Sequence, residues 1–401
     1  MAFRKFKPDY LFTGSQLLEN SMVLVCQEDG RVEAIVETQE AGEGVEWLNG
    51  LISPGFINCH CHLELSHLRG VIPQESGLIN FVESVMEKRV SSMEEIWQAI
   101  DSAETEMLQK GIVAVGDICN TLHSLQQKKQ KRLAYYNFVE ISGWSPDLVE
   151  GRLNQSLEQL NQFRQQGEGS NRCALAPHAP YSVSSRLWQL IEPSLREKTT
   201  TMHSQESLFE NELFEKGSGD LLQLYRRLQV RNPGFVPSGK SSLQTCLPYL
   251  LQSKQVLLVH NCFISAEDLD FCENLGTSMS GEPGRPGIFF CLCPRANWYI
   301  QRKLPPLDLL RRSILPLVLG TDSLASNESL DILEEIRLLI RHFPKLRLEE
   351  ALGWATKNGA RALGLEAEFG SLEAGKRPGI LLIEQLEDKE LGARSSVRRI
   401  L

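Results

Sequence analysis

Residues 55–70 read GFINCHCHLELSHLRG and place His60, His62 and His67 within eight positions of a chain that has only eight histidines. Histidines two residues apart on a β-strand point to the same face, so His60 and His62 can converge on one metal ion. The alternative is a polar loop with ordinary histidines, and an isolated His-x-His pair does not decide between the two. The rest of the chain has to show whether these side chains share a task.

The composition indicates a globular protein with a sizeable core, because 42% of the 401 residues are hydrophobic and 23% are charged. A net charge of −9 disfavours nucleic acid and anionic membranes as partners. The opening MAFRKFKPDYLFTG lacks the apolar run of a signal peptide, and no segment approaches the roughly 18 apolar residues of a membrane span. The ten cysteines show no framework spacing, so we expect reduced thiols and a cytoplasmic location.

The hydrophobic pattern changes near Leu51. Before it, two apolar runs flank Glu28-Asp29-Gly30, which predicts a hairpin. After it, apolar runs alternate with helix-length segments, one of which should begin after Ser92 and end at Gly111. This alternation predicts an α/β fold whose parallel strands close into a (β/α)8 TIM-type barrel. The eight strand-like runs are GFINCHCH, IVAVGDI, LAYYNFVEI, CALAPH, TTTMHS, QVLLVHN, IFFCLCP and ILPLVLGTDS.

Polar residues with metal-ligand chemistry stand where these apolar runs end. A lone histidine on an apolar strand is usually a core residue whose hydrogen bonds are satisfied. Several coincident placements on separate strands are hard to explain in that way, and the C-terminal strand ends form the active-site face of such barrels. We therefore predict one functional mouth. The residues that stand at it are His60, His62, His178, His203, His260 and Asp322.

An ordered set of motifs resembles the amidohydrolase superfamily, and within it the metal-dependent aminohydrolase (deaminase) branch. The resemblance spans nearly the whole chain. Within that branch, the chain is similar to deaminases of adenosine-type compounds, S-adenosylhomocysteine and aminodeoxyfutalosine. The motifs are NCHCHLELSHLRG (58–70), APHAPYS (176–182), HSQES (203–207), LVHN (258–261), CPRAN (293–297) and LGTDSLASN (319–327).

The resemblance implies a small β-sandwich built from both termini beside the barrel. We accordingly expect residues 1–54 and 359–401 to form the sandwich and residues 55–358 to form the hydrolase barrel. One departure is plain: relatives usually read GK-x-A-D-L-x near the end, whereas this chain has GKRPGILLIE. The departure affects the terminal domain and leaves the residues of the mouth intact.

The resemblance also implies a metal site. His60, His62, His203 and Asp322 are expected to hold one divalent ion, Zn(II) in the first place and Fe(II) as the alternative. Neutral imidazoles with one carboxylate suit either ion and leave a position for water. Binuclear relatives carry a carbamylated lysine at the end of the fourth strand, but here that run ends in His178 and contains no lysine. A single ion is therefore expected.

The proton carriers follow from the same resemblance. Asp322 is expected to take a proton from the water, while His260 polarises the reaction centre. Glu206 follows His203 by three residues, just beyond the strand end. From there its carboxyl group can carry a proton to a ring nitrogen of the substrate.

Four further residues are candidates for substrate contacts: His178, Arg69, Glu64 and Asn297. His178 can instead stabilise its own turn, Arg69 can hold its loop, and a turn role for Asn297 is an equal alternative. The segment 207–249 is longer than one helix requires, and it predicts a helix followed by a Pro/Gly-rich loop beside the mouth. Loops at that face of a barrel select the substrate.

These assignments predict a hydrolytic deaminase that removes an exocyclic amine from an aminated heterocycle, a 6-aminopurine or its nucleoside. Hydrolysis of a cyclic amide or a chlorotriazine on the same site is the second hypothesis. A catalytically silent barrel that acts as a scaffold is the third, although silent relatives usually lose metal ligands and this chain retains them. The expected partner is a small molecule. Related barrels are often homodimers, but no feature of the sequence shows an interface.

Overall fold

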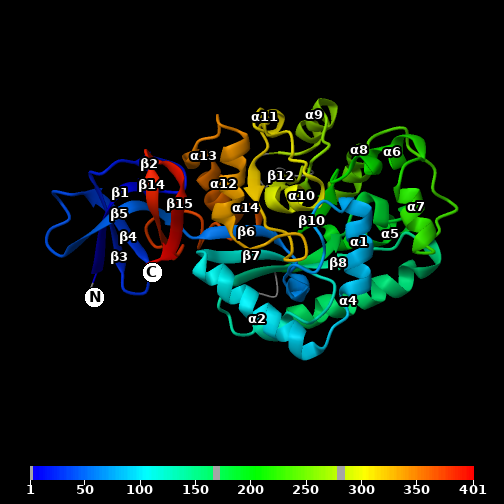
Figure 1. Cartoon of the computed structure of the whole chain (residues 1–401), viewed down its shortest axis with the longest axis horizontal. Helices are drawn as coiled ribbons and strands as arrows, with labels where there is room; N and C mark the ends of the chain where they lie inside the picture. The colour runs from blue at the N-terminus through cyan, green and yellow to red at the C-terminus, as the bar shows by residue number, and fades with distance from the viewer. Residues whose placement is uncertain (1–2, 166–171, 278–284) are drawn as a thin grey trace.

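Two four-stranded parallel sheets form the larger part of the fold (Figure 1). The structure, a computed structural model, describes residues 3–165, 172–277 and 285–401. One sheet has the order β6-β7-β8-β9 and the other the order β10-β11-β12-β13. Their strands are β6 (Phe56–Cys61), β7 (Ile112–Cys119), β8 (Ala134–Ile141), β9 (Cys173–Pro177), β10 (Thr199–Ser204), β11 (Gln255–His260), β12 (Gly287–Leu292) and β13 (Leu317–Leu319).

Helices connect most of these strands, as the alternating pattern predicts. The helix expected after Ser92 is α2 (Met93–Gln109), and it begins with a capping box in which Ser92 and Glu95 satisfy each other's backbone N–H groups. The other helices are α1 (Gly77–Lys88), α3 (Leu125–Lys128), α4 (Val149–Gln165), α5 (Ser185–Leu195), α6 (Leu208–Lys216), α7 (Leu221–Arg227), α8 (Ser242–Cys246), α9 (Ala266–Leu275), α10 (Pro294–Gln301), α11 (Leu307–Leu310), α12 (Ile332–His342), α13 (Leu348–Gly353) and α14 (Gly359–Ala362).

The predicted barrel needs one correction, because the hydrogen-bonded pairing of the eight strands is not continuous and is interrupted at two seams. At the first seam, β10 lies beside β9. The Thr200 hydroxyl donates to the Leu175 carbonyl at 2.9 Å, and the His203 N–H donates to the His178 carbonyl at 2.9 Å. A side chain thus occupies a backbone acceptor, and Pro177 has no N–H to offer at the end of β9. Regular pairing stops there for these reasons.

The second seam joins β6 to the segment that follows β13. The N–H groups of Thr321 and Asp322 both donate to the His60 carbonyl at 3.0 Å, and Cys61 pairs with Asp322 as an isolated parallel bridge. Gly320 makes this approach possible, because a Cβ atom there would lie 2.7 Å from the His60 Cβ and 2.9 Å from its backbone oxygen. β13 is only three residues long, so the seam is short.

A separate seven-stranded sheet is built from both ends of the chain (Figure 1). Its hydrogen bonds run without a break from β4 through β3, β1, β5 and β14 to β15, with β2 paired to β1, so the predicted β-sandwich is visible only in part. The expected hairpin around Asp29 joins β3 to β4. The strands are β1 (Phe3–Phe12), β2 (Leu17–Leu18), β3 (Met22–Gln27), β4 (Val32–Glu37), β5 (Val45–Pro54), β14 (Ile380–Glu387) and β15 (Glu390–Arg399).

The parallel strands form the buried interior of the protein. The strands β6, β7, β10, β11, β12 and β13 are buried along their whole length, and all ten cysteines are buried as well. Continuous apolar strands are typical of parallel sheets covered on both faces. Within residues 3–165, 172–277 and 285–401, no helix is both long and apolar enough to cross a membrane.

The short seam at Gly320 should be sensitive to a single methyl group. Gly320→Ala places a Cβ against the His60 backbone, so we expect the free energy of unfolding to fall by about 1–3 kcal/mol. Gly353→Ala is the matched control, since nothing lies within 4 Å of its Cβ position and its backbone is helical. Urea unfolding of both variants measures the difference. A Gly320→Ala protein as stable as the control would show that the seam is loose.

Candidate active site

A cavity of about 410 Å³ opens at the C-terminal ends of the parallel strands. This is a usual size for a pocket that encloses a small molecule. Its polar wall carries residues from strand ends, including His62, His178, His203, His260 and Asp322. Its apolar wall comes from helices and loops, and it is lined by Leu78, Phe81, Val82, Val85, Trp144, Leu224, Tyr225 and Val230.

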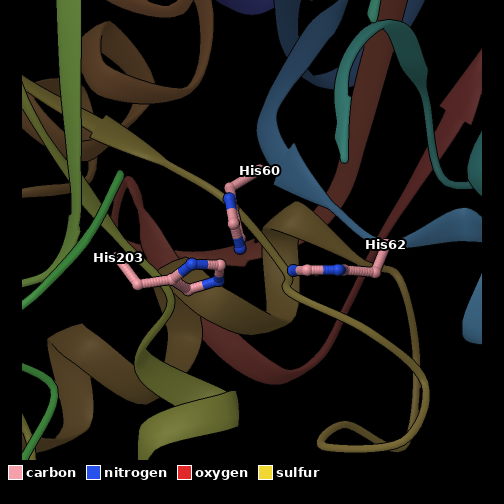
Figure 2. A group of neighbouring side chains, drawn as sticks. All are labelled: His60, His62 and His203. Atoms are coloured by element: carbon pink, nitrogen blue, oxygen red, sulfur yellow. The ribbon is translucent and has the colours of Figure 1, made fainter. Parts of the chain in front are cut away.

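Three imidazole rings converge beside this cavity. His60 and His62 lie at the end of β6, and His203 lies near the end of β10 on the other sheet. One ring nitrogen of each lies within 4.8 Å of those of the other two. Figure 2 shows the three rings pointing toward a common point. The structure thus brings together the three histidines that the sequence placed at one site.

Asp322 adds a carboxylate to the three histidines. Its Oδ1 lies 3.5 Å from His62 Nε2 and 3.7 Å from His60 Nε2, while its Oδ2 accepts a hydrogen bond from the Ser326 hydroxyl at 2.6 Å. Its backbone is in the left-handed region, with φ of 57°. Burial disfavours the charged form, but the neighbouring imidazoles outweigh burial and hold the pKa of Asp322 well below its usual range. The group is therefore an anion at neutral pH.

The ring nitrogens of the cluster are available as ligands. His203 Nδ1 lies 2.6 Å from the His178 carbonyl, so that nitrogen carries the proton and Nε2 keeps its lone pair. Both ring nitrogens of His60 and Nδ1 of His62 are buried without a hydrogen-bond partner among the described residues. Burial lowers the pKa of His62, and it lowers the pKa of His203 well below its usual value.

Neutral imidazoles with free lone pairs beside one carboxylate are a donor set that fits a divalent ion such as Zn(II) or Fe(II). Buried polar atoms without partners cost free energy, and an ion would remove that cost. The residues present therefore fit a metal ion.

A second carboxyl group, that of Glu206, also lines the cavity. Glu206 is 5% exposed, and its Oε1 lies 3.7 Å from Nε2 of His260. Burial raises the pKa of Glu206 well above its ordinary value, and burial lowers the pKa of His260 to about 3. Burial therefore favours the protonated form of Glu206, which can give a proton, and the neutral form of His260.

Glu206 is positioned by the turn that precedes it. Gln205 has a left-handed backbone with φ of 47°, and its N–H donates to Glu210 Oε1 at 2.7 Å. The Gln205 side chain donates to Asp268 at 2.7 Å, which ties the turn to α9. The Glu206 carbonyl accepts a hydrogen bond from the Gln301 side chain at 2.7 Å. The backbone at Glu206 is thus held from both sides.

Of the four residues predicted to contact the substrate, two line the cavity and two do not. His178 and Glu64 line the cavity, but the Glu64 carboxylate already accepts hydrogen bonds from the Thr121 N–H and hydroxyl. Arg69 is absent from the cavity lining and pairs with Glu106 on α2. Asn297 is fully buried behind His260, and its amide donates to His260 Nδ1 at 2.9 Å. It contacts a site residue rather than the cavity.

Sequence reasoning missed Glu140, which lines the cavity from the end of β8. Glu140 is the penultimate residue of the run LAYYNFVEI, so a search for polar residues near the strand ends could have found it. Trp144 and Tyr225 were missed as well, and no comparable signal marks them. The segment 207–249 does reach the cavity, through Leu224, Tyr225 and Val230 on α7 and the loop after it.

The fold and the site define an α/β protein with a cluster of three histidines and one aspartate at the ends of its parallel strands. The chain belongs to the Amidohydrolase family, whose sequence model matches residues 51–395. It is 29% identical over 336 residues to an adenosine deaminase of Helicobacter pylori, a match that covers 82% of this chain and 78% of that protein. The resemblance drawn from the motifs is confirmed.

Solved structures show the same fold. Aminofutalosine deaminase of Helicobacter pylori in complex with methylthio-coformycin superposes with a TM-score of 0.78 at 23% sequence identity, covering 99% of this chain and 100% of that one. An adenosine deaminase from Xanthomonas campestris with bound zinc gives a TM-score of 0.70 at 20% identity, covering 95% of this chain and 84% of that one.

The buried carboxyl group of Glu210, which holds the Gln205 turn, should make stability depend on pH. Burial raises the pKa of Glu210 from 4.5 to about 7, and its Oε2 has no hydrogen-bond partner among the described residues. Because the folded pKa lies above the unfolded value, stability is greatest below about pH 4.5 and is lost as the pH rises through about 7.

Glu210→Gln keeps the accepting oxygen and cannot ionise. Between pH 5 and pH 8, the variant should therefore lose about 2–3 kcal/mol less stability than the wild type. Urea unfolding at the two pH values measures this difference. Identical losses in the two proteins would mean that the Glu210 carboxyl group does not retain its proton in the folded state.

Proposed function

We propose that this chain is a metal-dependent hydrolytic deaminase that removes the exocyclic amine of a 6-aminopurine or its nucleoside. One observation carries the proposal. The carboxylate of Asp322 at the histidine cluster and the carboxyl group of Glu206 face one cavity, and their surroundings shift their pKa values in opposite directions, down for Asp322 and up for Glu206. Two carboxyl groups whose pKa values are pushed apart provide a base and an acid at the same pH. Membership of the Amidohydrolase family and similarity to a protein named adenosine deaminase support it.

In this proposal His60, His62, His203 and Asp322 hold one divalent metal ion. When bound, such an ion supplies a water molecule that is acidified toward neutral pH. Zinc is the favoured metal, and the zinc bound to the Xanthomonas campestris deaminase supports that choice. A single ion is proposed because β9, the fourth strand, contains no lysine that could bridge two.

The side chains of this chain then move the protons. Glu206 gives its proton to the ring nitrogen beside the carbon under attack, while Asp322 takes a proton from the water and passes it to the leaving amine. As the new carbonyl forms, the remaining hydroxyl proton returns to Glu206, and ammonia leaves. Because the Asn297 amide donates to Nδ1 of His260, the proton of that ring sits on Nε2 and can hydrogen-bond to the reacting oxygen.

We further propose that residues 55–358 work as one barrel unit, with residues 1–54 and 359–401 as the accessory β domain. The contacts between β9 and β10 and between β6 and β13 support a barrel held by two short seams. Both seams carry site residues, so the mouth requires both sheets.

Metal retention should depend on His203. His203→Ala removes one of three imidazoles, so we expect metal affinity to fall by more than about 100-fold. The matched control is His342→Ala, because His342 is exposed on α12, away from the cluster. Metal content after dialysis, with circular dichroism to confirm folding, measures the effect. Stoichiometric metal in dialysed His203→Ala protein would exclude His203 as a ligand.

The proposed reaction is tested by ammonia release from a panel of 6-aminopurines, their nucleosides and unrelated cyclic amides. We expect the metal-loaded protein to release ammonia from the aminopurine group. Glu206→Gln keeps the shape of the side chain but carries no proton, so kcat should fall by roughly 10²–10⁴-fold while metal content is unchanged. Turnover of cyclic amides alone would refute the deaminase proposal, and loss of metal in the variant would make Glu206 a ligand.

A further inference from the structure

A second cavity, of about 440 Å³, lies at the opposite ends of the parallel strands. It is bordered by Ala134 and Tyr135 at the start of β8 and by Cys173 at the start of β9. Gly379 and Leu401, next to β14 and β15 of the terminal sheet, line it as well. Among the described residues, none lines both this cavity and the one at the histidine cluster. The second cavity is therefore a separate place in the fold.

The wall of this second cavity is strongly basic. Seven of the described residues that line it are lysine or arginine, and only Asp29 and Glu368 are acidic. The whole chain has a net charge of −9, so the excess of positive charge is local. A concave surface that carries one sign of charge attracts small ions of the opposite sign. Four of the seven stand at the end of α3 or just after it: Lys128, Lys129, Lys131 and Arg132.

Two of these four cations are neutralised by the protein itself. Lys128 forms an ion pair with the buried Asp117, and Arg132 lies 3.2 Å from the carboxylate of the buried Glu104. Both pairs belong to the interior of the fold. They leave the other cations of the wall to account for the positive charge of the cavity.

Three arginines from distant segments face the same cavity and keep N–H groups unused. Arg399, on β15, donates through Nε to the backbone oxygen of Leu401 at 2.9 Å, and no described residue accepts a hydrogen bond from its two terminal nitrogens. Arg377 donates through Nε and Nη2 to the backbone oxygen of Asp29, at 3.2 and 2.9 Å. Arg172 has one long ion pair at 3.8 Å, which is exposed and therefore weak.

Like charges stand beside one another here. Burial, and after it the charge of Arg377, lower the pKa of Arg399. The exposed Lys129 side chain forms no ion pair or hydrogen bond with any described residue. An anion among these side chains would replace repulsion by attraction. The planar fork of a guanidinium group matches two oxygens of a phosphate, and a lysine adds a point charge.

We propose that this second cavity binds a diphosphate group, with Arg172, Arg377 and Arg399 as forks and Lys129 as a further cation. The cations come from separate segments around a cavity of about 440 Å³, which is more space than one phosphate group requires. Arg172 precedes β9, whereas Arg399 lies on β15, so the bound anion bridges the parallel strands and the terminal sheet. The proposal is independent of the deaminase function, because the two cavities are separate.

Isothermal titration calorimetry with inorganic pyrophosphate and with orthophosphate tests this proposal. Pyrophosphate should bind at least about tenfold more tightly than orthophosphate, because it reaches two cationic groups at once. Arg399→Gln should weaken pyrophosphate binding by about 10–100-fold through loss of charged hydrogen bonds. Arg398→Gln is the matched control, since it makes the same charge change one position earlier, where the side chain pairs with Glu384 at 3.2 Å outside the cavity. Its affinity should equal that of the wild type.

A second variant, Lys129→Gln, removes an exposed side chain without a described partner, so its folding should be unaffected. It should also weaken pyrophosphate binding, by about tenfold. Unchanged affinity in this variant would overturn the proposal even where Arg399→Gln fails to fold. Metal content is measured before and after each titration, so that extraction of an ion by pyrophosphate is not scored as binding.

Three further results would contradict the diphosphate site: no binding of pyrophosphate to the wild type, equal affinity for the two anions, or equal weakening in Arg398→Gln and Arg399→Gln. Uridine diphosphate, which has no 6-aminopurine ring, is titrated in parallel to identify the source of the group. Binding as tight as that of pyrophosphate would support a nucleotide as the source. Binding of pyrophosphate alone would support the free anion.

Discussion

The contact between the end of β6 and residues 320–322 is the constraint on which the site depends. The His60 carbonyl accepts two backbone hydrogen bonds there, from Thr321 and Asp322, and Gly320 removes the side chain that would keep the strands apart. These bonds hold the Asp322 carboxylate at 3.5–3.7 Å from two imidazoles that come from the first parallel strand. Without this seam, residues more than 250 positions apart in the chain would not share one mouth.

The neighbours of two carboxyl groups in the same cavity favour opposite states, although burial acts on both in the same direction. The imidazoles around Asp322 lower the pKa of its carboxyl group, whereas burial and the nearby carboxylates raise the pKa of Glu206. The same burial keeps His203 and His260 neutral. An environment that separates pKa values in this way lets one site carry an acid and a base. The turn at Gln205 and the Glu210 carboxyl group behind it keep Glu206 at the cavity.

The sequence led to much of this arrangement, and the departures have local causes. Apolar runs that end in His60, His203, His260 and Asp322 predicted both the α/β class and the common mouth, because parallel strands end at one face. The closed barrel was wrong as a hydrogen-bond pattern, since no periodicity reveals that Thr200 uses a backbone acceptor at the seam. The predicted sandwich is visible only in part, because strand pairing across the two termini depends on tertiary contact.

The sequence by itself determined which residue types stand at strand ends, and through its motifs the family to which the chain belongs. It determined these because strand direction and side-chain alternation are local properties of the chain. Only the tertiary structure decided which of those residues reach the cavity. It turned Asn297 toward His260, paired Arg69 with Glu106 and placed Glu140 in the cavity wall. Hydrogen-bond partners and burial arise from elements distant in sequence, and no local pattern encodes them.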